Sequence, residues 1–262
     1  MRSGKPAAAF AVLLVVSFAT MNAMPSDTLL AAMLQEAVLA LVALVAVRFA
    51  VPDALKRCTQ SVQQRNSVRF AGITLLLTGL VGGAITILTW YFANNGNGAG
   101  FVSAVLPSAV DLMENLLLLL GICLLTGLYE ESFMRVLGIE AFERALDTKR
   151  AILASAALFA LLHVGAPDVS AGQLVLLQTA LKFGQALLFG VILGALYVRT
   201  RRLWPCAFIH AGFDVLYLAP NVLLTGMMPE TYASGAVGDT VLLAVSVLML
   251  SGIVLKIRKE IA

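Results

Sequence analysis

The side chains that could do chemistry in this sequence are few, and they fall into three short groups within apolar segments. The groups comprise Glu130, Glu131, Arg135, Phe159, His163, His210 and Asp214. They include both histidines of the chain. An acid or base at membrane depth costs about 2.5–3.5 kcal/mol on insertion scales, so each one that is retained there is a candidate for function.

Helical spacing gives the two adjacent glutamates different roles. Glu131 and Arg135 are four residues apart and share one helix face, which is the arrangement of an ion pair. Glu130 is rotated by about 100° from Glu131 on a helix of 3.6 residues per turn, so it faces another direction. We expect Arg135 to lie near the cytoplasmic interface and to extend its side chain to the headgroups. The pair is predicted to hold the helix end while Glu130 faces a cavity and does chemistry.

The other two groups are also spaced so that each places its two side chains on one helix face. His210 and Asp214 are four residues apart on one helix face, and so are Phe159 and His163. A glutamate, two histidines and an aspartate from three helices are therefore predicted to converge on one pocket within the bundle.

Such a pocket suits two chemistries, and the sequence leaves both open. In the first, Glu130 activates a water while the histidines and Asp214 stabilise the oxyanion of a cleaved amide. In the second, a Zn²⁺ ion with an open position for water is held by ligands among His163, His210, Asp214 and Glu130. No His-Glu-x-x-His helix is present, so a metal would need ligands from different segments.

The elements that must position these residues are membrane helices. The chain has 262 residues, of which 60% are hydrophobic and 13% charged, and its mean hydropathy is +0.92. A soluble domain carries roughly 25% charged residues. This composition excludes an ordinary cytosolic globule, a nucleic-acid binder and a disordered protein. Eight segments approach the length of about 20 apolar residues that spans a bilayer. They are Ala7–Met24, Thr28–Val47, Phe70–Ala93, Leu112–Tyr129, Ala151–His163, Leu174–Val198, Leu203–Leu224 and Thr240–Leu255.

The basic residues indicate how these segments are oriented. Of the 18 Lys and Arg residues, all but Lys182 precede, follow or connect the segments on one side of an eight-span zigzag. The positive-inside rule then predicts an all-α bundle of about eight transmembrane helices with both termini cytoplasmic. No Ala-x-Ala cleavage pattern follows the first segment, so it is predicted to be a retained helix and not a signal peptide. Residues 1–262 are predicted to form a single integral membrane domain, with a motif-bearing catalytic core at about 112–225.

Polar and small residues outside the three groups receive structural interpretations. Lys182 and Glu36 both fall in the outer halves of their segments, and we expect an ion pair between them in preference to substrate contact by Lys182. Cysteines without paired spacing exclude a disulfide framework and a cysteine-rich zinc site; they are Cys58, Cys123 and Cys206. Four glycines are expected where helices pack closely: Gly82, Gly83, Gly184 and Gly190.

The three groups together resemble the three motifs of the CPBP family. The motifs read Glu130-Glu131-x-x-x-Arg135, Phe159-x-x-x-His163 and His210-x-x-x-Asp214. That family comprises the type II CAAX prenyl endopeptidases, the bacteriocin-processing and self-immunity (Abi-type) proteins, and their lysostaphin-resistance relatives. The motifs cover about a third of the chain. Each is weak alone, but all three stand in order on successive membrane segments, and the eight-helix count agrees with the CAAX endopeptidase branch.

The resemblance implies roles for individual residues. Glu130 matches the glutamate proposed to activate water, with help from the position of His163. His210 and Asp214 match positions assigned to oxyanion stabilisation or metal binding, and the family is interpreted both as metalloprotease and as glutamate protease. The CAAX-type enzymes usually have Asn where this chain has Asp214. An ionised Asp cannot donate a hydrogen bond to an oxyanion, so Asp214 must be protonated, orient His210 or bind a metal.

The predicted function is therefore hydrolysis of a peptide bond in a membrane-associated peptide or protein by an intramembrane endopeptidase. Its expected partners are membrane lipids and a peptide or protein substrate that could itself be lipidated. No nucleic-acid partner is expected. Short loops favour a bacterial protein of the inner (cytoplasmic) membrane. Two alternatives are a polytopic transporter, which predicts internal repeats that are not evident here, and a non-catalytic scaffold or immunity protein, which the intact motifs disfavour.

Overall fold

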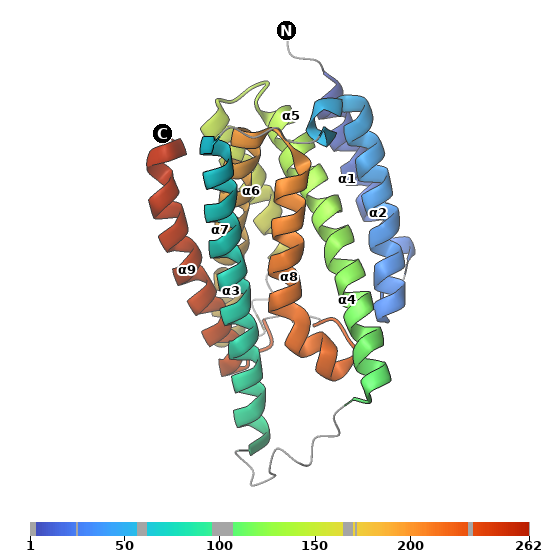
Figure 1. The fold of residues 1–262 in the computed structure, drawn as a ribbon, viewed down its shortest axis with the longest axis vertical. Coiled ribbons are helices and arrows are strands. Elements are labelled where there is room, and N and C mark those ends of the chain that lie inside the picture. The colour runs from blue at the N-terminus through green and yellow to red at the C-terminus, as the bar shows by residue number, and fades with distance from the viewer. Residues whose placement is uncertain are drawn as a thin grey trace.

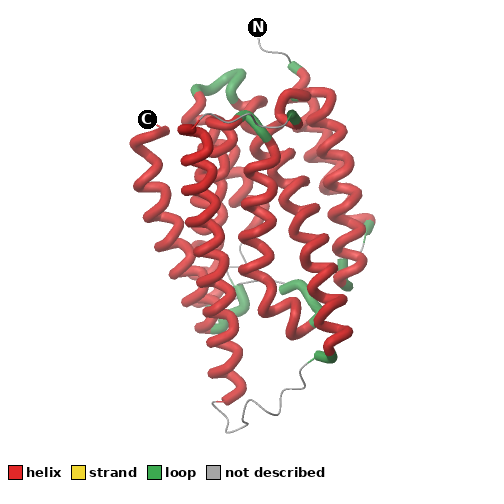
Figure 2. Tube along the Cα trace, viewed as in Figure 1, coloured by secondary structure: helices red, strands yellow, loops and turns green. Residues whose placement is uncertain are grey.

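The fold is a bundle of long helices, seen in a computed structural model that describes residues 4–24, 26–56, 62–95, 107–164, 170, 172–229 and 233–261 (Figure 1). Every regular element in these ranges is helical (Figure 2). In chain order the elements are α1 (Lys5–Ala23), α2 (Leu29–Ala50), η1 (Pro52–Leu55), α3 (Val62–Asn95), α4 (Ala109–Glu130), η3 (Glu131–Ile139), α5 (Glu140–Phe142), α6 (Thr148–Val164), α7 (Gln173–Thr200), α8 (Leu203–Thr225) and α9 (Val237–Ile261). The prediction of an all-α polytopic bundle is confirmed.

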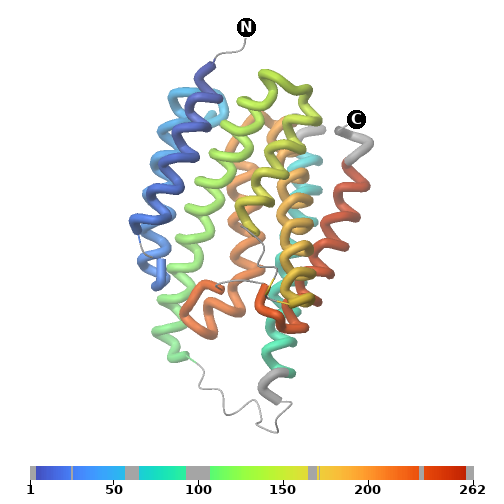
Figure 3. The backbone as a smooth tube through the Cα atoms, turned by 180° about the vertical axis from the view of Figure 1, so that it is seen from behind, coloured from blue at the N-terminus to red at the C-terminus, as the bar shows by residue number. Residues whose placement is uncertain are grey.

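Seven helices in the described part of the chain are long and apolar enough to cross a membrane. They correspond to seven of the eight predicted segments; the other segment is α6, which has 17 residues. At 1.5 Å per residue it is about 26 Å long, slightly less than a hydrocarbon core of about 30 Å. It starts at the end of the bundle where α1 begins and stops near mid-height (Figure 3). The C-terminal end of α9 lies at that same end of the bundle (Figure 1).

The outer surface of the bundle is apolar, as expected of helices in contact with lipid. Large side chains such as Phe49, Val110 and Leu248 are 75%, 74% and 72% exposed. A water-soluble monomer rarely exposes a contiguous apolar surface of this kind. The chain is therefore a multi-pass membrane protein.

The helix that carries the first motif is longer than the sequence predicts. It begins at a capping box, in which Ser108 Oγ accepts from the Asp111 amide and the Asp111 carboxylate accepts from the Ser108 amide. It continues through Glu130 as η3 and α5 to Phe142, for 34 residues in all. The segment η3 is a π-helix. This form is rare in proteins, and where it occurs it is often at a functional site. All nine of its residues are buried, so the motif lies inside the bundle and not at its end.

Small residues set the separation between the helices that hold the site. A Cβ atom on Gly190 of α7 would lie 2.9 Å from the Cβ of Ala156 on α6, and one on Gly127 of α4 would lie 2.6 Å from the carbonyl oxygen of Ala207 on α8. Close packing is likewise confirmed at Gly82 and Gly83, which face α8. At Gly184 there is room for a Cβ, so that expectation was wrong. Cys123 and Cys206 are buried thiols, and Cys58 lies outside the described residues.

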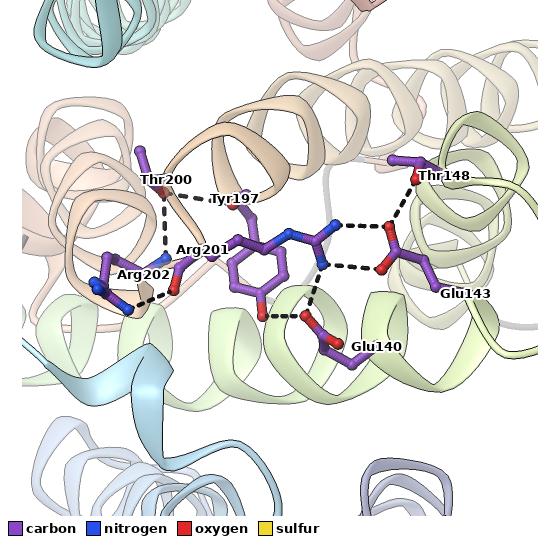
Figure 4. A network of polar contacts seen from close by, with 7 residues as sticks. All are labelled: Glu140, Glu143, Thr148, Tyr197, Thr200, Arg201 and Arg202. Carbon is purple, nitrogen blue, oxygen red and sulfur yellow. Dashed lines mark hydrogen bonds and ion pairs between the residues drawn. The ribbon is translucent and has the colours of Figure 1, made fainter. Parts of the chain in front are cut away.

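Arg201, at the end of α7, binds the segment that connects the first motif to the second (Figure 4). Arg201 Nη1 donates to Glu140 Oε1 (2.7 Å) and Glu143 Oε2 (2.9 Å), and its Nη2 donates to Glu143 Oε1 (2.8 Å). The Tyr197 hydroxyl also donates to Glu140, and the Thr148 hydroxyl donates to Glu143. Burial of the guanidinium works against its charge, but the hydrogen bonds and charges of Glu143 and Glu140 outweigh it and raise the pKa of Arg201. This network links α5, the start of α6 and the end of α7.

Replacing Arg201 with lysine is expected to lower the free energy of unfolding by about 1–2 kcal/mol. A lysine keeps the charge but loses the bidentate geometry with Glu143, and hydrogen bonds to charged groups contribute about 1.5–3 kcal/mol each. The measurement is an SDS unfolding titration in mixed micelles. Arg150→Lys is the control, because that side chain is 75% exposed and pairs with the exposed Asp147 three residues earlier. Equal effects of the two substitutions would show that the network does not hold these segments.

Candidate active site

Three chain segments bring the predicted acids and histidines to one place. Glu130 lies at the junction of α4 and η3, His163 at the end of α6, and His210 and Asp214 on α8. Glu130 Oε1 is 4.0 Å from His163 Nε2, and Glu130 Oε2 is 3.6 Å from His210 Nε2. His210 Nε2 is also 3.3 Å from Asp214 Oδ2. The Glu130 carboxylate therefore stands between the two imidazoles.

The backbone of its own helix orients His163. Its Nδ1 lies 2.9 Å from the carbonyl oxygen of Phe159. A carbonyl can only accept, so Nδ1 carries the hydrogen and the basic nitrogen of the neutral ring is Nε2. The Phe159 ring supports this orientation, with its centroid 4.2 Å from that of the imidazole. The lone pair of His163 thus faces Glu130.

The second glutamate of the motif orients His210. Glu131 Oε1 lies 2.8 Å from His210 Nδ1, and Glu131 Oε2 lies 3.2 Å from Arg135 Nε. The Phe189 ring packs edge-on against the imidazole at a centroid distance of 4.8 Å. His210 is consequently buried, with its Nε2 directed at Glu130 and Asp214. The predicted Glu131–Arg135 pair exists, and its additional role is to fix this ring.

Arg135 does not extend to the headgroups, and this expectation was wrong. Its side chain is fully buried, and its guanidinium carbon lies 4.5 Å above the ring centroid of Phe159. The reason is that the motif helix continues to Phe142, so Arg135 is well inside the bundle. The second motif thus contributes Phe159 as a ring packed between Arg135 and His163.

The longer helix also explains how His163 reaches Glu130. From the sequence, Glu130 is expected about seven residues from its helix end, with His163 deeper in the membrane. In the structure Glu130 lies 12 residues before the helix end at Phe142, and His163 lies 15 residues after the start of α6 at Thr148. Glu130 Oε1 and His163 Nε2 are 4.0 Å apart. The two side chains therefore meet at similar depth.

Two cavities adjoin the site and share Phe159 and His163 in their walls. The larger one, about 230 Å³, is bordered by Glu130 and by apolar side chains of α1, among them Leu14, Phe18 and Met21. The smaller one, about 50 Å³, is bordered by side chains of α6, α7 and α8. Its polar members are His163, Lys182, Gln185, His210 and Asp214. Glu130 of the first motif thus borders the larger cavity, and His210 and Asp214 of the third motif border the smaller one.

Two charged residues that sequence reasoning set aside lie near the site. Lys182 borders the smaller cavity and donates from Nζ to Gln185 Oε1 at 3.1 Å. Glu36 of α2 forms a hydrogen bond with Thr126 of α4, and its charge acts on Glu130. The ion pair between Glu36 and Lys182 stays a prediction. No motif includes Lys182, so the only sequence feature that points to it as a residue near the site is its position inside a membrane span.

The arrangement of donors bears on the zinc alternative. Each histidine engages Nδ1 with a protein acceptor and directs Nε2 inward, as zinc ligands do. Among the described residues, however, no three His, Cys, Asp or Glu side chains are placed so that they could hold one ion together. The donor types suit zinc, but their placement does not.

The comparison with known families agrees with the motif geometry. Residues 112–216 match the family model described as type II CAAX prenyl endopeptidase Rce1-like. No curated protein is similar enough to the chain to count as a match. The matched range runs from α4 into α8 and contains all the residues of the three motifs. Residues 112–216 of this multi-pass membrane protein are therefore similar to the type II CAAX prenyl endopeptidase Rce1-like family.

Proposed function

We propose that this chain is an intramembrane endopeptidase in which Glu130 activates the attacking water. The observation that carries the proposal is the placement of the Glu130 carboxylate between the Nε2 atoms of His163 and His210, at 4.0 and 3.6 Å. The first separation is too long for a direct hydrogen bond. A water between Glu130 and His163 would donate one hydrogen to each and turn its oxygen toward a bound peptide.

The first chemical step is attack of this water on the carbonyl carbon of the scissile bond. The water oxygen forms the new C–O bond, its proton passes to Glu130, and the carbonyl π pair moves to the oxygen. Negative charge is thereby transferred from the Glu130 carboxylate to the oxyanion. His210 donates from Nδ1 to Glu131, so it carries a second hydrogen on Nε2 only as the imidazolium, and in that form the Nε2–H stabilises the oxyanion.

The second step reverses the direction of the proton. Protonated Glu130 gives its proton to the amide nitrogen, the oxyanion pair returns to carbon, and the C–N bond breaks. The products are a new carboxyl terminus and a new amine, and one water is consumed. A single residue acts first as base and then as acid, which requires that it contact both the water and the leaving nitrogen.

The larger cavity supports a hydrophobic substrate. Its volume of about 230 Å³ is smaller than the roughly 300–1,000 Å³ of sites for drug-sized ligands, so it suits one or two apolar side chains. Phe18, Met21 and Leu162 on its rim are lipid-facing residues of α1 and α6. We propose that the peptide enters sideways from the bilayer between these helices.

The test uses purified protein in lipid bicelles and a pair of internally quenched CAAX peptides. One carries S-farnesyl cysteine, in line with the activity that the matched family's description names, and the other has a free cysteine. The wild type is expected to cleave at least one of them, and the pair distinguishes prenylated from unmodified substrates. If neither peptide is cleaved, the proposed function is wrong for this peptide class. Cleavage of other substrates is then tested by quantitative sequencing of new termini in membranes that express the wild type or Glu130→Gln.

Chelation is expected to leave this activity unchanged within about twofold. The reason is that the donor placement supports water activation by Glu130 and not by a bound ion. The measurement is the cleavage rate after dialysis against 1,10-phenanthroline, together with the metal content of the active sample. Loss of activity on dialysis and its recovery with Zn²⁺ would contradict the metal-free scheme.

A further inference from the structure

The small cavity beside His163 is also lined by polar residues that water activation leaves unused, namely Lys182, Gln185 and Asp214. Its volume is about 50 Å³. A water needs at least about 10–15 Å³ measured in this way, so the cavity has room for a carbonyl oxygen and a water but not for a substrate side chain. Because His163 and Phe159 border both cavities, a peptide carbonyl at His163 can turn its oxygen into the small cavity while Glu130, which borders the larger one, acts on the carbonyl carbon.

Lys182 is the lysine in the wall of this cavity, and a chain of hydrogen bonds fixes it there. Its Nζ donates to Gln185 Oε1 at 3.1 Å, and Gln185 Nε2 donates to the Tyr217 hydroxyl at 3.0 Å. Tyr217 in turn shares a hydrogen bond with Ser246 of α9. The ammonium is therefore held from α7 through α8 to α9. An ammonium at membrane depth is costly and is retained where it has a partner or a function.

The charges around the cavity make a cation useful at this position. Asp214, in the same wall, can only accept hydrogen bonds when ionised. Lys182 lines the same cavity as Asp214. During attack the negative charge moves from Glu130 to the carbonyl oxygen. A fixed cation next to the destination of that charge stabilises the transition state more than the ground state.

We propose that the small cavity is the oxyanion pocket and that Lys182 is a catalytic residue, which donates a hydrogen bond from Nζ to the carbonyl oxygen as its charge develops. The ammonium keeps its protons throughout, so no bond to it forms or breaks. This inference rests on the proposed endopeptidase function and assigns to Lys182 the donor role that an ionised Asp214 cannot fill.

The experiment compares Lys182→Met, Lys182→Arg and Thr179→Val in bicelles with the quenched CAAX peptide that the wild type cleaves. Removing one oxyanion donor costs about 10²–10³-fold in kcat, so we expect that loss for Lys182→Met with KM changed less than threefold. Lys182→Arg keeps a cationic donor, so its kcat should be at least tenfold higher than that of Lys182→Met. Thr179 is the control on the same helix, because its hydroxyl bonds only to the Val175 carbonyl one turn earlier among the contacts described.

A second readout separates a transition-state role from a structural one. A phosphinate analogue of the same peptide mimics the tetrahedral intermediate, and Lys182→Met should raise its Ki by the same factor by which kcat/KM falls. Should Lys182→Met fail to fold, as judged by its unfolding transition, Lys182→Leu replaces it with the same expected loss, because leucine also has no hydrogen-bond donor.

Three outcomes would overturn the inference. If Lys182→Met keeps kcat within threefold while Glu130→Gln is inactive, the endopeptidase function stands and the role of Lys182 is wrong. If the loss disappears in an Asp214→Asn background, Lys182 only neutralises Asp214. If wild type and Glu130→Gln are alike, the proposed function itself fails.

Discussion

Replacing Glu130 with glutamine is expected to lower kcat by at least ~10³-fold without changing the unfolding transition. General acid–base catalysis contributes about 10²–10⁴-fold, and here one residue serves in both proton transfers. An amide of the same shape still fills the space between His163 and His210, but it cannot take the proton of water. The measurement is single-turnover cleavage of the quenched peptide by purified protein in bicelles.

The structure explains why Glu130 and not Glu131 is expected to carry the chemistry. Glu131 is fully buried and already contacts His210 Nδ1 at 2.8 Å and Arg135 Nε at 3.2 Å. The Glu130 side chain is 20% exposed and borders the larger cavity. Glu131→Gln should therefore reduce stability and activity together, whereas Glu130→Gln should affect activity alone.

A matched control is available on the same helix. Glu114 is exposed near the opposite end of α4 and has no part in the site. Glu114→Gln changes the same charge on the same element and should cleave at the wild-type rate. Retention of more than a tenth of wild-type activity by Glu130→Gln would show that another group activates the water.

The elements of this fold were predictable because apolar length is a strong signal. Segments of about 20 apolar residues have few alternatives to a membrane helix, since every backbone group must be paired inside lipid. The three motifs likewise predict which side chains meet, because four-residue spacing fixes a helix face. What the spacing does not give is where a helix stops. The motif helix is amphiphilic after Tyr129, and only packing against its neighbours keeps it helical and buried to Phe142.

That one difference accounts for what was missed in the site. A π-helical segment has no sequence signature, so the start of η3 at Glu131 could not be foreseen. The burial of Arg135 and the depth of Glu130 both follow from it. The division of the site into two cavities depends on the side-chain packing of Phe159 and His163, which no spacing rule contains. Lys182 was noticed as an unusual charge, but its neighbours come from three helices and only the tertiary structure identifies them.

Replacing Arg135 with methionine is expected to lower the free energy of unfolding by about 3–5 kcal/mol. Breaking a buried ion pair from one side leaves an uncompensated charge, here that of Glu131. The substitution also removes the contact of the guanidinium with the Phe159 ring, which is 4.5 Å away. The measurement is an SDS unfolding titration in mixed micelles. Arg150→Met is the control, because its pair with Asp147 is exposed and should contribute less than about 1 kcal/mol.

The double variant Glu131→Gln/Arg135→Met shows whether the buried charge is the cause. Removing Glu131's charge as well leaves no uncompensated carboxylate, and the glutamine oxygen can still accept from His210 Nδ1. The double variant should therefore be more stable than Arg135→Met alone by at least about 1 kcal/mol, an interaction of the size expected for residues in direct contact. Additive losses from the two substitutions would mean that Arg135 stabilises the bundle through packing on Phe159. In that case His210 would depend on Glu131 alone for its orientation, and the oxyanion geometry would survive the loss of Arg135.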